Sequence, residues 1–557
     1  MKSAGSARWW LLAGSMLVSG VLVAGAFNPA PHSGGDNSTY VSLAYGLIET
    51  GSYTEVFDPA GLPHTKYPPF FPGLLAAVIA LGATSWAALK LTAVVSTVSA
   101  VGLTYVWAER RLGAWSAFAV AVLFESSAAV IYYSHWILSD PVFVALTLAS
   151  FCALERSAAG ERRPALWLTV GVVVAGLAYF TRSAGLPLVA AILAWLAIER
   201  RWRAAGVTAV ALGVPAAAWW WRSRGAVGSY AAEFWLVDPY QPTLGTIGVL
   251  DLIPRAMANA VAYVTRHGPS GIVGPGGNGV AALGIVLTLA ALYGWVRTLR
   301  ERIGPVEIFF PLYTGLILVW PVVWSGDRFA LPLYPVILLY CAVALRDLTR
   351  RIPGVWSGPL AALALLVLLL PAGASWLRAA REARACAAVV REQGSFACYG
   401  PGVMAFVEAA AWAGAALPEG AAVLTRKPSH FYVMSGVPSR TFPFDPDPAA
   451  HLALADELGA SYVLLDEWDG LAVRNVGAAV LARPGAFCFV RAFGSPGAGG
   501  AQLLGILPPG QRSDTAPVSP ELARVAVCPS SYATDGAHGA YSSSSPGSIP
   551  LLDGLAP

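Results

Sequence analysis

The sequence predicts a polytopic α-helical membrane protein of about eleven transmembrane helices, followed by a small C-terminal α/β domain. Three observations predict this fold class. Of the 557 residues, 56% are hydrophobic and only 12% are charged, whereas soluble domains carry roughly 25% charged residues. Long apolar runs recur through the first 375 residues, and arginines cluster in alternate short loops between them. After that point charges return, and short β-branched or aromatic runs alternate with helical patterns.

The apolar runs are expected to be helical because a helix satisfies its own backbone hydrogen bonds in lipid. We interpret the first run as an uncleaved span and not as a signal peptide, because many spans follow it. Residues 70–82 follow a double proline and are too short for a span, so we expect a re-entrant or interfacial helix there. The eleven expected spans are 9–27, 86–108, 115–137, 141–154, 165–180, 184–198, 204–221, 279–296, 305–323, 329–345 and 355–375.

The orientation follows from the placement of arginine. Arginine-rich loops come after the second, fourth, sixth, eighth and tenth spans, and Lys2 and Arg8 precede the first. The positive-inside rule puts all of these in the cytoplasm, together with the N-terminus. The polar loop 28–85 and everything after residue 375 are then outside. We therefore expect a multi-pass protein of a bacterial plasma (inner) membrane whose C-terminal domain is extracytoplasmic.

The expected organisation has three parts: a membrane domain at 1–375 with the external loop 28–85, an α/β domain at 376–508, and a disordered tail at 509–557. The tail is rich in Ser, Pro and Gly. The net charge of +4 gives no argument for a nucleic-acid partner. Four cysteines would face an oxidising compartment, so one or two disulfides are expected. Their pairing stays open among three arrangements; the cysteines are Cys386, Cys398, Cys488 and Cys528.

The external loop contains the first candidate for chemistry, Asp36. It begins an amphipathic helical pattern that includes Tyr40, Leu43 and Leu47 and that Gly51 closes, which predicts a helix lying along the outer membrane face. A carboxylate at this place could accept the proton of an acceptor hydroxyl. It could equally be an ordinary N-cap. The residues alone leave these two alternatives even.

A second carboxylate, Asp140, lies at the outer end of the fourth span. Asp at N-cap followed by Pro141 at N1 is an ordinary helix start, and the residues alone favour it. A carboxylate at a membrane edge is also a functional candidate. Three cations, Lys66, Arg182 and Arg328, are expected on the same side. Each could reach lipid headgroups singly, or they could together neutralise a phosphate.

Other functional classes find less support. His32, His64 and His135 show no metal-ligand spacing, and Asp445-Pro-Asp447 is typical of a turn. There is no P-loop and no Gly-x-Ser-x-Gly motif. A transporter or lipid flippase is the main alternative, but such proteins place ionisable residues within spans. Here the spans are nearly free of acids except Glu125. A scaffold whose external domain is the active part is a third class.

Several motifs resemble those of the GT-C glycosyltransferases, both in their order along the chain and in their expected position on the outer side. They are Asp36 in the first external loop, Lys-Tyr-Pro-Pro at 66–69, Leu-Ser-Asp-Pro at 138–141, Tyr-Phe-Thr-Arg-Ser-Ala-Gly at 179–185, Arg-Phe-Ala-Leu-Pro-Leu-Tyr-Pro at 328–335 and Val-Leu-Thr-Arg-Lys-Pro-Ser-His-Phe-Tyr-Val-Met-Ser-Gly at 423–436. The resemblance covers roughly residues 9–493. It is nearest to the bacterial branch that includes the lipid A aminoarabinose transferase and the protein O-mannosyltransferases.

The resemblance implies an inverting transfer of a sugar from a polyprenyl-phosphate carrier to an extracytoplasmic acceptor. Asp36 matches the catalytic base and Asp140 the second external acidic position. Lys66 matches a cation that binds the lipid phosphate. The other residues expected to bind substrate are Arg182, Arg328, Tyr40 and Tyr67.

Many members of the family have Asp-Glu in the first loop, whereas Asn37 follows Asp36 here. A second carboxylate is therefore missing from that loop. We accordingly predict no required metal and no cofactor beyond the lipid-phosphate-linked sugar. The sugar stays open, and so does the acceptor, which could be a lipid, a polysaccharide or a protein.

Overall fold

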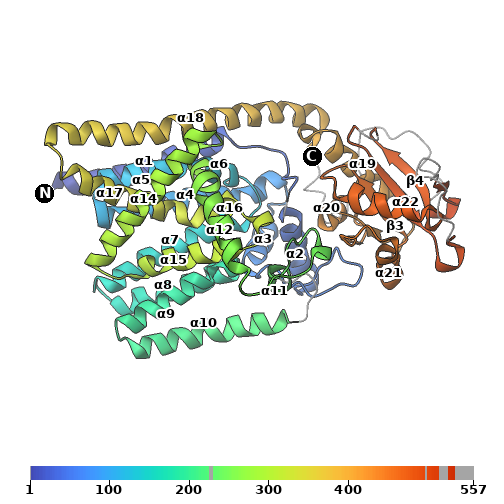
Figure 1. Cartoon of the computed structure of the whole chain (residues 1–557), viewed down its shortest axis with the longest axis horizontal. Helices are drawn as coiled ribbons and strands as arrows, with labels where there is room; N and C mark the ends of the chain where they lie inside the picture. Colours follow the sequence, from blue (N-terminus) through green and yellow to red (C-terminus); the bar gives the residue numbers. More distant parts are fainter. Residues whose placement is uncertain (1, 35, 225–229, 496–497, 514–524, 534–557) are drawn as a thin grey trace.

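The computed structural model describes residues 2–34, 36–224, 230–495, 498–513 and 525–533. It consists of a long helical bundle with a smaller sheet-containing domain at one end (Figure 1). The helices up to the C-terminal domain are α1 Lys2–Gly25, α2 Asn37–Thr50, α3 Phe70–Ala80, α4 Trp86–Leu112, α5 Ala114–Ser126, α6 Ala128–Tyr133, α7 Ser139–Ala158, α8 Pro164–Thr181, α9 Leu186–Ile198, α10 Trp202–Arg222, α11 Tyr230–Phe234, α12 Leu252–Ala262, α13 Gly268–Val273, α14 Asn278–Glu301, α15 Pro305–Val319, α16 Asp327–Ala330, α17 Tyr334–Thr349 and α18 Gly354–Gln393.

The bundle has the composition of a multi-pass membrane protein. Within the described residues, eight helices are long and apolar enough to cross a bilayer. Shorter apolar helices at Ala114–Ser126, Ser183–Ile198 and Pro305–Leu318 fall where three further spans are expected. The predicted polytopic helical class is thus confirmed, and the count of eleven spans stays a prediction.

The run at 115–137, expected to be one span, is instead two helices. α5 ends at Ser126 and α6 begins at Ala128, with Ser127 between them in a non-helical conformation. The hydroxyls of Ser126 and Ser127 both donate to the carbonyl of Leu123, at 3.2 and 2.8 Å. Serine hydroxyls compete with the backbone for such carbonyls and favour helix breaks. Hydropathy alone does not register this break.

Helix α2 packs its apolar side against protein, and its expected position along the membrane face stays a prediction. Its side chains Tyr40, Leu43 and Ala44 are buried, and the helix contacts α3 and the later helix α20 (Pro428–Ser435). Only its last turn, from Ile48, is exposed before the left-handed Gly51 ends it. The apolar side chains of α2 therefore pack in a hydrophobic core cluster with Phe71.

Two polar clusters mark opposite ends of α7. At its C-terminal end, Arg111 donates to Glu155 at 2.9 Å and to Glu307 at 2.6 Å, and Arg346 donates to the carbonyl of Arg111 at 2.9 Å. This cluster joins the ends of α4, α7, α15 and α17. At the other end of α7 is Asp140, in the cluster described below. The bundle thus has two distinct polar ends, as expected if successive loops lie on alternate sides.

The C-terminal domain is an α/β unit, as predicted. Its six strands have the order β2-β1-β3-β5-β4-β6, in which β2, β1 and β3 are parallel and β5 is antiparallel to both β3 and β4. The elements are α19 Pro401–Ala416, β1 Val423–Leu424, α20, β2 Ser439–Arg440, α21 Pro448–Leu458, β3 Tyr462–Asp466, α22 Ala478–Ala482, β4 Phe487–Phe493, β5 Ala501–Ile506 and β6 Ala526–Val527.

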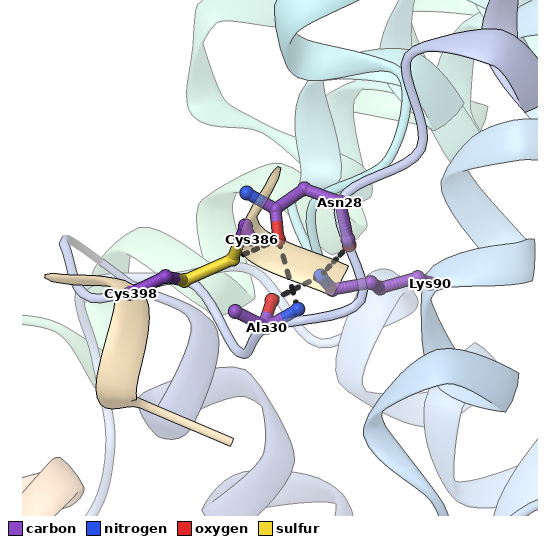
Figure 2. The surroundings of a disulfide bond; sticks show 5 residues. All are labelled: Asn28, Ala30, Lys90, Cys386 and Cys398. Carbon is purple, nitrogen blue, oxygen red and sulfur yellow. Dashed lines mark hydrogen bonds between the residues drawn. A yellow bond between two sulfur atoms is a disulfide. The ribbon is translucent and has the colours of Figure 1, made fainter. Parts of the chain in front are cut away.

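Helix α18 connects the two parts without interruption. It runs along one side of the bundle and reaches the C-terminal domain (Figure 1), so no break in secondary structure marks the boundary placed at residue 375. Near its end, Cys386 is disulfide-bonded to Cys398. Figure 2 shows this disulfide against the start of the 28–85 loop, where Cys386 Sγ lies 3.3 Å from Asn28 Oδ1 and the buried Lys90 donates to the carbonyl of Asn28 at 2.7 Å.

The second disulfide joins Cys488 in β4 to Cys528, which resolves the pairing that the sequence left open. Just before Cys528, strand β6 pairs in parallel with β4. The disorder expected from residue 509 onward is therefore wrong for 525–533, where the cross-link attaches the chain to the sheet. Positions 514–524 and 534–557 lie outside the described residues.

Candidate active site

One guanidinium connects the two candidate carboxylates. Arg328, at the start of α16, donates from Nη2 to Asp36 Oδ2 at 2.9 Å and from Nε to Asp140 Oδ2 at 2.9 Å. Arg182, in the turn between α8 and α9, approaches the same oxygen of Asp140 at 2.8 Å. The structure thus brings four of the sequence-predicted site residues into one ion-pair network, at the end of the bundle next to the C-terminal domain.

Neither carboxylate acts as a helix cap. Asp36 occupies the N-cap position of α2, but its side chain makes no capping hydrogen bond. The N-cap of α7 is Leu138, so Asp140 lies within the first turn and the expected start, with Asp140 at N-cap and Pro141 at N1, is wrong. Both side chains instead point to Arg328. The N-cap alternative therefore does not account for either residue.

Two tyrosines complete the network around the carboxylates. The Tyr67 hydroxyl donates to Asp36 Oδ1 at 2.7 Å. The Tyr40 hydroxyl is 2.9 Å from Ser139 Oγ, which also accepts from Arg182 at 3.1 Å. Burial, with the charge of Asp36 nearby, raises the pKa of Tyr67 well above its usual range. Its phenol therefore stays protonated and holds one carboxylate oxygen in place.

The local charges set the protonation of Asp36. Burial by itself would raise the pKa of this carboxyl, but the Arg328 guanidinium and the Tyr67 hydrogen bond lower it to about 2. The side chain keeps 22% of its surface exposed, so it remains accessible. With the Arg328 guanidinium in contact, Asp36 is an ionised carboxylate near neutral pH. Its pKa would rise if this guanidinium moved away.

A cavity of about 160 Å³ opens beside this network. Its polar wall contains Arg182 together with Tyr40 and Tyr67. The remaining wall is mostly apolar and comes from α9, α15 and α16, with side chains that include Leu186, Tyr313, Leu316, Ile317, Trp320 and Phe329. A charged group at one side and an apolar surface at the other are what an amphiphilic phosphate ester requires.

Lys66 lies near the cavity but is not in the ion-pair network. Its Nζ is 2.7 Å from a carboxylate oxygen of Glu233 and 5.1 Å from the ring centroid of Tyr230, both in α11. Tyr230 itself lines the cavity. Glu233 and Tyr230 are not among the residues that the sequence predicted for the site. Glu233 had one usable signal, since it is an acid in a long outer loop with few acids.

The histidines are occupied by structural contacts. His64 Nδ1 is 2.8 Å from Glu55, and His64 Nε2 accepts from the Tyr67 amide at 2.9 Å, which positions Tyr67. His32 is 3.0 Å from Asn37 Nδ2, and burial lowers its pKa to about 4. Within the described ranges no group of three His, Cys, Asp or Glu residues could hold a metal ion. The prediction of no required metal stays a prediction.

The C-terminal domain is docked over the loop that contains Asp36. Arg440 forms a two-pronged pair with Asp58 at 2.6 and 2.5 Å. In α20, Ser429 accepts from Thr39 at 2.9 Å, and His430 Nε2 is 3.3 Å from the His32 carbonyl. These contacts place the N-terminal end of α20 beside the first turn of α2.

Comparisons with known proteins bear on the fold. Residues 66–221 match the family described as dolichyl-phosphate-mannose-protein mannosyltransferase. No curated protein matches the sequence. Among solved structures, the oligosaccharyltransferase of Archaeoglobus fulgidus tethered to an acceptor peptide is 14% identical, with a TM-score of 0.56 over 89% of this chain and 74% of that chain.

Two further structures carry lipid carriers. AglB from Archaeoglobus fulgidus, in complex with an inhibitory peptide and a dolichol-phosphate, is 16% identical, with a TM-score of 0.56 over 89% of this chain and 74% of that chain. ArnT from Cupriavidus metallidurans bound to undecaprenyl phosphate is 13% identical, with a TM-score of 0.49 over 90% of this chain and 98% of that chain. The resemblance drawn from the motifs is thus confirmed: the chain is a membrane protein of the GT-C fold, and its residues 66–221 are similar to the protein mannosyltransferase family.

Proposed function

We propose that the protein is an inverting membrane glycosyltransferase that moves a sugar from a polyprenyl-phosphate carrier to an acceptor outside the cytoplasm. The observation that carries the proposal is the network in which Arg328 joins Asp36 and Asp140 beside a cavity with Arg182 in its wall. The match to a dolichyl-phosphate-mannose family and the dolichol-phosphate bound by AglB support the same donor class.

The orientation in the membrane belongs to this proposal. The arginine-rich ends of the helices meet at the Arg111 cluster, and the Asp36 network lies at the opposite end of α7. With the arginine-rich end in the cytoplasm, the network and the C-terminal domain are on the outer side of a bacterial plasma membrane. A lipid-linked donor presents its phosphate at that surface.

The proposed reaction is a single displacement. The acceptor hydroxyl attacks the anomeric carbon from the face opposite the phosphate, and its proton passes to Asp36. The bond between the anomeric carbon and the phosphate oxygen breaks, and the electron pair leaves with the polyprenyl phosphate. Arg182 and Arg328 stabilise the negative charge that develops on that oxygen, and the apolar cavity wall receives the first prenyl units.

Donor binding would also activate the base. In the free protein Arg328 keeps the pKa of Asp36 near 2, too low for an efficient base near neutral pH. A phosphate that competes for the Arg328 guanidinium would remove part of this charge from Asp36. Burial would then act with less opposition and raise the pKa of Asp36. The base would thus become effective only when the donor is in place.

We propose further that no metal is required. The guanidinium of Arg328 lies between Asp36 and Asp140, the two carboxylates that a divalent cation would otherwise join. Asn37, where a second loop carboxylate would be expected, donates its side-chain amide to the Gly34 carbonyl at 3.1 Å. Over the described part of the chain, no three His, Cys, Asp or Glu side chains are grouped so that they could hold a metal.

The test is sugar transfer by purified full-length protein in nanodiscs, supplied with radiolabelled polyprenyl-phosphate sugars and extracted envelope acceptors. Asp36→Asn should lose transfer by at least about 100-fold, whereas Glu49→Gln, an exposed carboxylate on the same helix, should keep it. Normal transfer by a folded Asp36→Asn protein would overturn the role of this residue. Transfer from a nucleotide-sugar without a lipid carrier would overturn the donor class.

A further inference from the structure

A second group of polar residues lies at one edge of the C-terminal sheet. Strands β1 and β3 are neighbours and parallel, so their carboxyl ends meet at the same edge. From β1 the chain passes through α20 to β2 on one side, and then through α21 to β3 on the other. The strand order thus reverses at β1. In open α/β sheets, ligands bind outside the carboxyl ends of the strands at such a reversal.

Three side chains at this edge carry polar atoms without a partner among the described residues, although Asp466 Oδ1 accepts from the Trp468 amide at 3.0 Å. Leu424, the last residue of β1, pairs with Val463, and Thr425 and Lys427 follow β1 while Asp466 ends β3. Thr425 Oγ1 and Asp466 Oδ2 are fully buried without a hydrogen-bond partner. Lys427 Nζ lies 4.8 Å from the ring centroid of Trp468 and makes no hydrogen bond or ion pair to another described residue. Unsatisfied buried polar groups are costly, and each one requires an explanation.

Arg426, which precedes Lys427 in the sequence, differs from Lys427 because it has an ion-pair partner. Arg426 is paired with Asp469 at 3.0 Å and lies 5.5 Å from the ring centroid of Tyr240, in the long loop of the membrane domain. Tyr240 in turn is 6.3 Å from Trp324, whose ring centroid lies 5.4 Å from Lys66 Nζ. An aromatic strip thus runs from the Lys66 side of the cavity to the edge of the C-terminal sheet.

The edge also faces the candidate base. Lys427 immediately precedes α20, the helix whose Ser429 and His430 contact Thr39 and His32 on either side of Asp36. Burial lowers the pKa of Lys427, and the negative charges around it, first Asp469 and Asp466 and then Asp36, act in the opposite direction. In Figure 1, α20 lies at the boundary between the C-terminal domain and the bundle, in keeping with these contacts.

We propose that Thr425, Lys427 and Asp466 form an acceptor subsite that binds the hydroxyl groups of a saccharide and presents a neighbouring hydroxyl to Asp36. This inference rests on the proposed glycosyltransferase function and narrows its acceptor to a glycan. The chemistry selects hydroxyls because the three side chains combine donors with acceptors. An anionic group would satisfy Lys427 but would leave Asp466 facing a like charge.

The direct test is saccharide binding to the full chain in nanodiscs, measured by saturation-transfer NMR with the methyl glycosides of mannose, glucose, galactose and arabinofuranose. We expect at least one to bind, and Lys427→Met and Asp466→Asn each to weaken it at least about tenfold. The exposed residues Arg384 and Glu419 provide matched controls, Arg384→Met and Glu419→Gln, which should bind normally. Binding of none of the glycosides, or equal binding by all variants, would overturn the subsite.

A second measurement separates this inference from the proposed function. In the transfer assay, Lys427→Met and Asp466→Asn should raise the KM for the acceptor while slow hydrolysis of the lipid-linked donor stays at the wild-type rate. Transfer with an unchanged acceptor KM overturns the subsite and leaves the glycosyltransferase intact. Saccharide binding that is lost in both variants, without any transfer from a lipid donor, supports the subsite and overturns the reaction.

Discussion

Arg328 donates a 2.9 Å hydrogen bond to Asp36 although 292 positions of sequence separate them. The same guanidinium reaches Asp140, so the proposed base, the second carboxylate and the proposed phosphate ligand are coupled through one side chain. Any change in the charge of this side chain should therefore alter the proton affinity of Asp36.

The first prediction concerns this coupling. Arg328→Gln removes the cation that lowers the pKa of Asp36 from its ordinary value of 3.8 to about 2, while the burial that raises it remains. The transfer activity that remains should then be lost on acidification, and the midpoint of this loss should lie at a pH well above the midpoint for the wild type. The measurement is the pH dependence of kcat/KM between pH 4 and 8. Coincident acidic limbs for the variant and the wild type would refute the coupling.

A second prediction concerns Lys66, whose charge is shared with Glu233 and the ring of Tyr230. Because a cation near the cavity attracts the donor phosphate in both ground and transition states, Lys66→Met should raise the KM for the donor more than it lowers kcat. Lys66→Arg keeps the charge and should restore much of the affinity. A loss confined to kcat would instead assign Lys66 to the chemical step.

The third prediction concerns metal dependence. If Arg328 provides the positive charge between Asp36 and Asp140, transfer should survive prolonged dialysis against EDTA within about twofold. Readdition of Mg²⁺ or Mn²⁺ should not increase it. The guanidinium geometry is planar and two-pronged, so Arg328→Lys should not restore full activity. Loss of transfer on chelation that Mn²⁺ alone restores would reject the metal-free proposal.

The fourth prediction concerns stability and pH. Burial raises the pKa of Asp466 from 3.8 to about 6, so the folded domain binds this proton more tightly than the unfolded chain does. Its ionisation should therefore cost stability progressively as pH rises from about 4 to about 6, by about 2–3 kcal/mol in total. Asp466→Asn should be more stable than the wild type at pH 7, with a smaller difference at pH 4.5. Hydrogen exchange of the β3 amides would measure this.

The fifth prediction concerns docking of the C-terminal domain. Arg440→Ala leaves Asp58, whose side chain is 3% exposed, without its partner. Removing one member of a buried pair costs about 3–5 kcal/mol, so protection of the 55–64 loop from proteolysis should fall sharply. The control is Arg512→Ala, since its partner Asp456 is 43% exposed and such pairs contribute at most about 1 kcal/mol. Equal protection in both variants would mean that other contacts hold the domain.

The sequence predicted the class of fold because span length and arginine placement are local properties. It also named Asp36, Asp140, Arg182 and Arg328 as candidates. What it could not give is their connection, since a guanidinium shared across 292 and 188 positions depends on how α2, α7 and α16 pack. The same limit explains α2, whose apolar stripe is compatible with lipid or protein until Phe71 and α20 are placed against it.

The errors at Ser127 and Asp140 have a different origin. Both depend on which hydrogen-bond partner a short polar side chain takes. Ser127 donates to the Leu123 carbonyl, and Asp140 accepts from the distant guanidinium of Arg328 and does not cap its helix. Hydropathy averages over such choices, and residue preferences at helix ends report only the commonest one.

The uninterrupted helix α18 has a mechanical consequence. Its 40 residues extend about 60 Å, roughly twice the hydrocarbon thickness of a bilayer. Trp376, midway along it, donates to the Leu22 carbonyl at 2.8 Å, and Cys386 lies against Asn28. A helix clamped at these points resists stretching, so it acts as a spacer of constant length. It keeps the sheet edge of the C-terminal domain at one fixed distance from the helical bundle.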